Sequence, residues 1–137
     1  MSLPKSKRKP SSVQFLETAK ELYNYTRKMC VTLPKRYTFF GLAQMFDCAC
    51  RMREFIKKGN SLFPSNKHEV QMRRDCFLNA KMELQALADH IGDIREIFPI
   101  EDKAIVIWLK LLTDEKNLLT TILERDKERY NKANFKE

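Results

Sequence analysis

The sequence has few residues that favour turns or break helices. Its 137 residues include only 3 glycines and 5 prolines, and we find no low-complexity tract and no internal repeat. A β-rich fold usually needs more turn residues than this, so we expect a helical protein. The apolar stretches fall short of the ~18 residues that a membrane span requires. The basic N-terminus is not followed by the apolar segment of a secretory signal, which predicts a cytoplasmic protein with no membrane partner.

The sequence also lacks the spacings of enzymes built on helical bundles. Di-iron bundles use Glu-x-x-His, but Ser65 and Leu87 stand three residues before His68 and His90. Neither histidine follows an arginine by four to six residues, as HEPN-type ribonuclease bundles require. There is no P-loop, no dinucleotide-binding motif and no nucleophile elbow. We therefore expect no enzymatic activity and no cofactor.

The four cysteines, Cys30, Cys48, Cys50 and Cys76, do not form a recognised metal-binding motif. Cys48-x-Cys50 is not C-x-x-C, and two residues at that spacing on a helix point ~200° apart. In a reducing cytoplasm we expect free thiols that act as small apolar side chains. A zinc site built from Cys30, Cys76 and a histidine is the remaining alternative to the prediction of no metal.

Positive charge is concentrated in the first half of the chain. The whole chain has a net charge of +8. Residues 1–75 contain 16 Lys/Arg and 6 Asp/Glu, a net charge of +10, whereas residues 76–137 contain 10 and 12, a net charge of −2. Such a distribution favours an acidic partner, and RNA or DNA is the commonest one. The alternative is that these charges only keep the surface of the helices soluble.

Four segments with helical periodicity follow one another with short connections. We expect a flexible basic arm at 1–10, a domain at 11–132 with helices at about 12–33, 39–58, 67–98 and 101–131, and a tail at 133–137. The predicted fold is all-α, an antiparallel up-down-up-down four-helix bundle. In the third segment, apolar residues follow a heptad pattern that only Arg73 interrupts. The apolar face of the fourth segment is predicted to include Trp108 and Leu109.

Residues near the expected helix ends are suited to capping. Ser11 and Gln14 have the spacing of a capping box, and so do Asn66 and Glu69. Pro34 should end the first helix, and Thr38 can cap the second, which we expect to end at Gly59. The acidic residues at 101 and 102 suit the positive N-terminus of the fourth helix.

The second segment is too apolar for a helix on the outside of a monomeric bundle. Of its 18 residues from 39 to 56, 12 are apolar, whereas packing on one side needs an apolar face only about 100° wide. We therefore expect self-association, with an exposed apolar patch as the alternative. The predicted interface residues are Phe39, Phe40, Met45, Met52 and Phe55. The aromatic residues are expected in the core or between subunits, and Tyr37 is the only candidate for stacking on a base.

Antiparallel topology would bring the arm, the end of the second helix and the start of the third to one end of the bundle. A basic arm beside a fixed basic rim binds phosphates without reading bases. At the opposite end, the same topology would place Lys35 and Arg36 beside the acidic residues Glu96, Glu101 and Asp102. The candidate phosphate ligands are Lys5, Lys7, Arg8, Lys9, Lys35, Arg36, Arg51, Arg53, Lys57, Lys58, Lys67, Arg73 and Arg74.

Two segments, LPKRYTFFGLAQMF (residues 33–46) and EFIKKGNS (residues 54–61), carry a family resemblance. They resemble the accessory variability determinant proteins of diversity-generating retroelements, which are relatives of the bacterial ribosomal-RNA intervening-sequence proteins. The resemblance implies a four-helix protein that forms a pentamer, binds nucleic acid non-specifically and assists a reverse transcriptase. It matches Lys35 and Arg36 to a basic corner, and Lys57 and Lys58 in position only.

Two hypotheses about function therefore remain. The first is a non-enzymatic, oligomeric protein that binds RNA or DNA through phosphates, as an accessory to a reverse transcriptase. The alternative is a four-helix adaptor or scaffold, in which the cations only increase solubility and the apolar second helix docks a partner protein.

Overall fold

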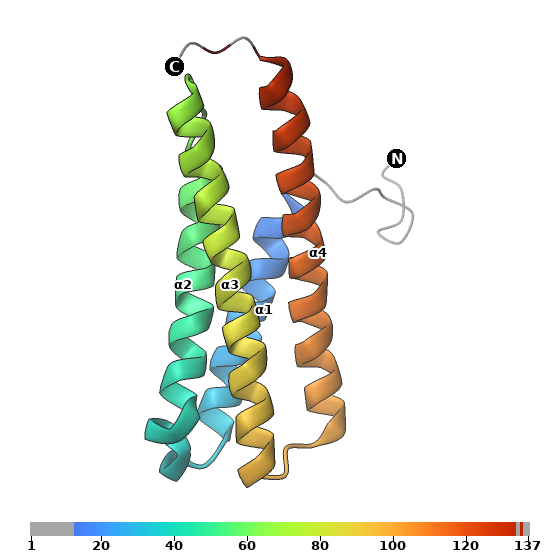
Figure 1. The fold of residues 1–137 in the computed structure, drawn as a ribbon. Helices are drawn as coiled ribbons and strands as arrows, with labels where there is room; N and C mark the ends of the chain where they lie inside the picture. The colour runs from blue at the N-terminus through green and yellow to red at the C-terminus, as the bar shows by residue number, and fades with distance from the viewer. Residues whose placement is uncertain (1–12, 134, 136–137) are drawn as a thin grey trace.

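The computed structural model describes residues 13–133 and residue 135. The predicted arm, including Lys5, Lys7, Arg8 and Lys9, and the predicted Ser11 cap lie outside the described residues. The four long helices are α1 (Gln14–Thr32), α2 (Ala43–Ser61), α3 (Lys67–Ile97) and α4 (Asp102–Lys132) (Figure 1). The prediction of an all-α four-helix bundle is confirmed, and each long helix falls within a few residues of its expected range, with α2 shifted the most.

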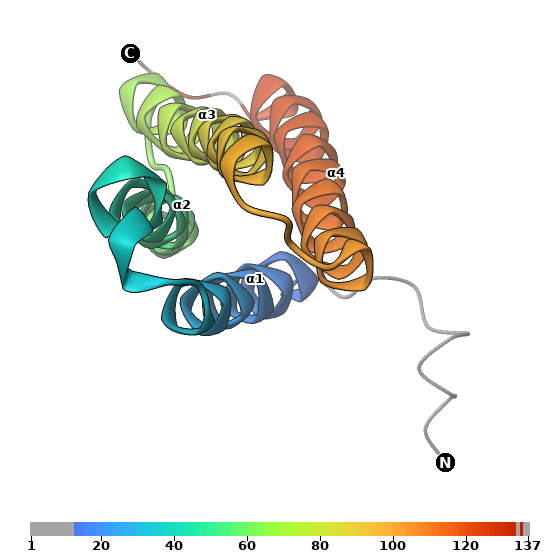
Figure 2. The same ribbon diagram turned by 90° about the horizontal axis from the view of Figure 1, so that it is seen from below.

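Contacts between α1 and α4 show that these two helices run antiparallel. Along α1 and α4, the Tyr25 hydroxyl donates to the Ala104 carbonyl at 2.8 Å, while Gln14 and Thr18, earlier in α1, lie beside Thr121, later in α4. Seen end-on, the helices form a ring in chain order, with α4 closing it against α1 (Figure 2). Each end of the bundle therefore collects residues from all four helices.

The core lies along the axis of this ring. The predicted heptad of α3 points into it: every member from Arg73 to Ile94 is buried, and Val70 and Phe98 at the two ends are half-buried. Trp108 on α4 is fully buried, and its indole N–H donates to the Thr26 hydroxyl at 3.0 Å. The prediction for Leu109 is wrong, because its side chain is 38% exposed.

The start of α3 has one half of the predicted capping box, while the Glu69 side chain bonds to Ser65 and not to Asn66. The Asn66 side chain accepts a hydrogen bond from the Glu69 backbone N–H at 2.8 Å. The Glu69 carboxylate in turn accepts from the Ser65 backbone N–H at 2.8 Å and from its hydroxyl at 2.6 Å. These hydrogen bonds lower the pKa of Glu69. The connection between α2 and α3 is thus held in place beside the ends of both helices.

The corner between α1 and α2 is less regular than the sequence indicates. After Pro34 the chain forms a 3₁₀ turn, η2 (Lys35–Tyr37), and a π-helical turn, η3 (Thr38–Leu42), before α2 begins. The expected Thr38 cap is wrong: the Thr38 hydroxyl donates to the Lys35 carbonyl at 2.7 Å. A Cβ on Gly41 would lie 2.7 Å from the Ile94 side chain, so the corner packs closely on α3.

Gly59 does not end α2, which continues to Ser61. A Cβ at this position would lie 2.8 Å from Cε1 of Phe77 on α3. The glycine therefore serves the close packing of α2 on α3, where the aromatic ring occupies the space that a side chain would need. Among the described residues, no helix is both long and apolar enough to cross a membrane.

Candidate nucleic-acid interface

The two ends of the bundle differ in charge. We call residues 13–23, 51–78 and 119–132 the arm end, because α1 begins there, and residues 24–50 and 79–118 the corner end. The arm end contains 12 Lys/Arg and 8 Asp/Glu, whereas the corner end contains 9 of each. The surplus of positive charge in the described helices is thus confined to the arm end, as the topology predicted.

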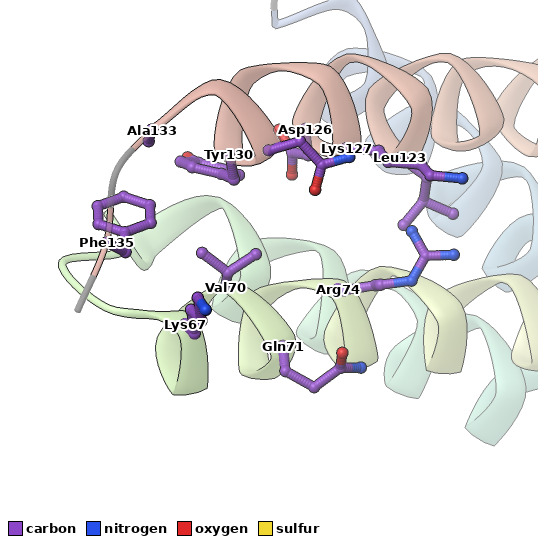
Figure 3. A pocket seen from close by; sticks show the side chains of 11 residues that line it. Lys67, Val70, Gln71, Arg74, Leu123, Asp126, Lys127, Tyr130, Ala133 and Phe135 are labelled. Carbon is purple, nitrogen blue, oxygen red and sulfur yellow. The ribbon is translucent and has the colours of Figure 1, made fainter. Parts of the chain in front are cut away.

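A groove between α3 and α4 at the arm end is the largest cavity described here, with a volume of about 560 Å³ (Figure 3). We call it the α3–α4 groove. Arg74 extends from α3 toward α4 near Leu123, and Tyr130 and Phe135 lie at the other end. The rings of Tyr130 and Phe135 have centroids 5.9 Å apart and planes at 32°. Its lining residues are Lys67, Val70, Gln71, Arg74, Leu123, Asp126, Lys127, Tyr130, Asn131, Ala133 and Phe135.

Asp126, the one carboxylate among the described residues that line this groove, is paired with a buried arginine. Arg73 Nε lies 2.6 Å from Asp126 Oδ2, and both residues are 9% exposed. Arg73 also donates to the carbonyls of Gly59 and Leu62, at 3.0 and 3.2 Å. The prediction that Arg73 binds phosphate is therefore wrong, because its donors are used inside the protein. Its effect on the groove is indirect: it neutralises a carboxylate that would repel an anion.

The remaining charged residues of the groove are cations. Lys67 and Arg74 come from the first turns of α3, and Lys127 comes from the last turns of α4. Lys67 and Lys127 are exposed, and Arg74 is half-buried. Cations from two helices that face one hollow can contact a phosphate together, and Arg74 has the planar donors that suit bidentate contacts.

A smaller cavity of about 290 Å³ lies on the other side of Tyr130, against the start of α1 and the connection after α2. We call it the α1–α4 hollow. It shares Asp126 and Tyr130 with the α3–α4 groove, and two more cations, Arg125 and Arg129, line it. Phe63 is at its edge and is 84% exposed. Its lining residues are Val13, Phe15, Asn60, Phe63, Arg73, Ile122, Arg125, Asp126, Arg129 and Tyr130.

From the sequence, neither Phe63 nor any residue of α4 was predicted to line these two cavities. The run ERDKERYNK (residues 124–132) contains both acidic and basic residues, so its composition does not indicate an anion-binding surface. The helical spacing does contain a signal: residues 123, 126, 127 and 130 recur every three to four positions and so share one face of a helix. That face meets α3 and forms one wall of the groove.

The cations of α2 line the opposite side of the arm end. Arg53 and Lys57 border a hollow of about 340 Å³ between α1 and α2, and Lys20 of α1 lies there as well. Arg53 is stacked over Tyr23, 5.0 Å from the ring centroid. Lys58 is 5.8 Å from the centroid of Phe55. These side chains thus extend the basic surface around the end of the bundle.

Arg51 and Arg36, two of the predicted phosphate ligands, contact other side chains of the bundle. Arg51 forms an ion pair with Glu83 at 2.9 Å, in which the arginine side chain is half exposed. Arg36 covers the face of Tyr37 at 4.8 Å, and Tyr37 also packs on Phe98, with centroids 5.5 Å apart. One face of Tyr37 is therefore covered by Arg36. Lys35 and Arg36 lie at the corner end, so the structure does not bring them together with the arm-end cations.

The predicted oligomer interface divides into two groups. Phe39 and Phe40 are 84% and 75% exposed, and Phe55 is half-buried. The prediction is wrong for Met45 and Met52, which are fully buried in the core of the protomer. The reason is that α2 packs against both α1 and α3, which uses two sides of its wide apolar surface within one chain.

The described residues contain no group of histidine, cysteine and acidic side chains that could hold a metal ion. The four cysteines have free thiols, and burial raises the pKa of Cys30 to about 11. One buried carboxyl was not predicted from the sequence. Glu115 on α4 is fully buried, and burial raises its pKa to about 9. Neither of its carboxyl oxygens has a hydrogen-bond partner among the described residues.

Comparisons of the chain with protein-family models, with curated proteins and with solved structures give no significant match.

Proposed function

We propose that this chain is a non-enzymatic, cytoplasmic nucleic-acid-binding protein that contacts phosphates through the arm end of the bundle. The observation that carries the proposal is the α3–α4 groove, where Lys67, Arg74 and Lys127 face a common hollow. The only carboxylate among its described lining residues is paired with Arg73. Further cations continue this surface through the α1–α4 hollow and across α2.

Such a surface binds the nucleic-acid backbone without reading the sequence of bases. Phosphate contacts by lysine and arginine release counterions, so affinity falls as the salt concentration rises. The four cations of residues 5–9 precede the arm end in the chain and add to its positive charge. The proposal therefore includes Lys5, Lys7, Arg8 and Lys9 as additional phosphate ligands.

The resemblance through residues 33–46 and 54–61 extends the proposal in two ways. It suggests a homo-oligomer, by the resemblance a pentamer, for which the exposed rings of Phe39 and Phe40 are available. It also suggests an accessory role beside a reverse transcriptase. Copurification of a tagged chain with a reverse transcriptase encoded next to it would test that role, and an adjacent gene of another kind would count against it.

The direct test is the salt dependence of binding to RNA and DNA. If about six phosphates are neutralised, the log–log slope of affinity against salt should be about −5. The double variant Arg74→Ala/Lys127→Ala should weaken binding and reduce the slope by about 2. The matched control is Lys35→Ala/Arg36→Ala at the corner end, which removes the same charge and should have little effect. A larger loss in the control would place the interface at the corner end.

A chain without residues 1–10 should bind more weakly and show a smaller slope, because four cations are removed. If the full chain does not bind at low salt, or if its binding does not depend on salt, the proposal is wrong.

The second candidate is a protein–protein adaptor, and one observation favours it. Phe39 and Phe40 expose two adjacent aromatic rings at the corner end, where charge is balanced. A strict monomer in solution that binds no nucleic acid would support an adaptor whose docking face includes these rings.

A further inference from the structure

We infer that the arm end binds unpaired strands in preference to duplexes, with bases on the aromatic rings around Tyr130 and phosphates on the cations between them. This inference rests on the proposed function and adds the class of nucleic acid. It is motivated by the way aromatic and basic side chains alternate across the two cavities that meet at Tyr130.

Three aromatic residues line the two cavities at the arm end. Phe63 stands at the edge of the α1–α4 hollow, Tyr130 borders both cavities, and Phe135 lies against Tyr130 in the α3–α4 groove. Phe63 is 84% exposed, so its ring is open to solvent. Exposed aromatic faces are suited to stacking on bases, and every base offers such a face.

Cations alternate with these rings. Arg125 and Arg129 lie on the Phe63 side of Tyr130, and Arg74 and Lys127 lie on the Phe135 side. A strand that crosses Tyr130 would therefore meet positive charge on both sides of each stacked base. Because Arg73 neutralises Asp126, the described residues that line the two cavities include no unpaired carboxylate.

The volume of the α3–α4 groove is compatible with single strands. At about 560 Å³ it lies within the range of pockets that bind small ligands, so its size suits an unpaired base. In a duplex the bases are stacked and paired, and their faces do not reach aromatic side chains. A duplex would contact only the outer cations, whereas a single strand would gain stacking in addition. The same reasoning applies to RNA and to DNA, and it predicts little dependence on base sequence.

The test compares single strands and duplexes of equal length by fluorescence anisotropy, with uridine and thymidine oligomers as probes. The single strand should bind about tenfold more tightly than the duplex, or better. Phe63→Ala should weaken single-strand binding about 5- to 150-fold and weaken duplex binding much less, because only the single strand can stack on the ring. Tyr130→Ala should act in the same direction. The control is Met82→Ala, which removes a large exposed apolar side chain of α3 at the corner end and should change neither affinity.

The results separate this inference from the function on which it rests. Equal affinity for single strands and duplexes, with the salt dependence intact, would overturn the inference and leave nucleic-acid binding in place. Loss of binding to both probes at low salt would overturn the proposed function. Because Phe63 is almost fully exposed, its substitution does not disturb the core, and an unchanged single-strand affinity in Phe63→Ala would also overturn the inference.

Discussion

Arg73 on α3 and Asp126 on α4 form a buried ion pair, with Nε 2.6 Å from Oδ2 and Nη2 3.4 Å from Oδ1. The two side chains are only 11% and 13% exposed. Arg73 also packs over the face of Phe77, 5.0 Å from the ring centroid. The pair therefore joins α3 to α4, and through two backbone carbonyls it joins the end of α2 as well.

Removing one partner of this pair should be strongly destabilising. We expect Asp126→Ala to lower the free energy of unfolding by about 3–5 kcal/mol, because it leaves a buried arginine without a counterion. The double variant Arg73→Met/Asp126→Leu should be close to the wild type, since no buried charge remains. Urea denaturation measures both. A loss below about 1 kcal/mol in Asp126→Ala would show that water or another acid compensates Arg73.

Glu115 should make stability depend on pH. Its pKa is raised to about 9 in the folded chain from an ordinary value of 4.5, because the carboxyl is buried. Below about pH 4.5 both states are protonated and Glu115 carries no ionisation penalty. Between about pH 4.5 and 9 the unfolded chain releases the proton and the folded chain keeps it, so stability should fall as the pH rises, by up to about 1.4 kcal/mol per pH unit.

The control for this effect is Glu115→Leu. The variant should be more stable at neutral pH, because an apolar side chain of similar size replaces a carboxyl without hydrogen-bond partners. Its stability between pH 5 and 9 should also vary less than that of the wild type. Urea denaturation at several pH values measures both quantities, and equal pH profiles in the two proteins would contradict the prediction.

Alanine substitutions at Gly59 and Gly92 should change the stability of the protein in opposite directions. At Gly59 the new Cβ would lie 2.8 Å from Phe77, so Gly59→Ala should destabilise the bundle by about 1–3 kcal/mol. At Gly92, also inside a helix, nothing lies within 4 Å of the new Cβ. Gly92→Ala should therefore stabilise the protein by about 0.4–1 kcal/mol. Thermal denaturation compares them, and a neutral Gly59→Ala would mean that the ring of Phe77 moves aside easily.

The exposed rings at the corner end should drive self-association. We expect the wild type to sediment as an oligomer and Phe39→Ser/Phe40→Ser to sediment as a smaller species, because the substitutions remove the largest exposed apolar side chains of this corner. Circular dichroism should show the helical content unchanged, since neither ring belongs to the core. A wild type that is monomeric at high concentration would contradict this prediction.

The sequence predicted the elements of this protein because its helices are long and strongly periodic. The heptad of α3 from residue 70 to residue 98 needs only local spacing to be read, and the same spacing fixes which side of the helix is buried. Connections of a few residues then leave an antiparallel bundle as the compact arrangement. With the topology known, the end that carries the positive charge follows from counting residues.

The spacing of residues along one helix did not predict which side chains pair or pack between helices. Arg73 was predicted as a phosphate ligand, and only the position of Asp126, 53 residues later, makes it an internal ion pair. Met45 and Met52 were assigned to a subunit interface, but the packing of α2 between two neighbours buries them within one chain. In each case the partner that decides the role of the residue lies on another helix.

The α3–α4 groove is likewise a feature that depends on contacts between helices. The composition, the helical periodicity and the positions of the charged residues predicted a basic helical bundle with its surplus charge at one end. Only the tertiary structure decided that Arg74 and Lys127, which are far apart in the chain, face one hollow beside Tyr130. The physical reason is that burial and charge pairing depend on distances between helices, which are set by side-chain packing across the whole bundle.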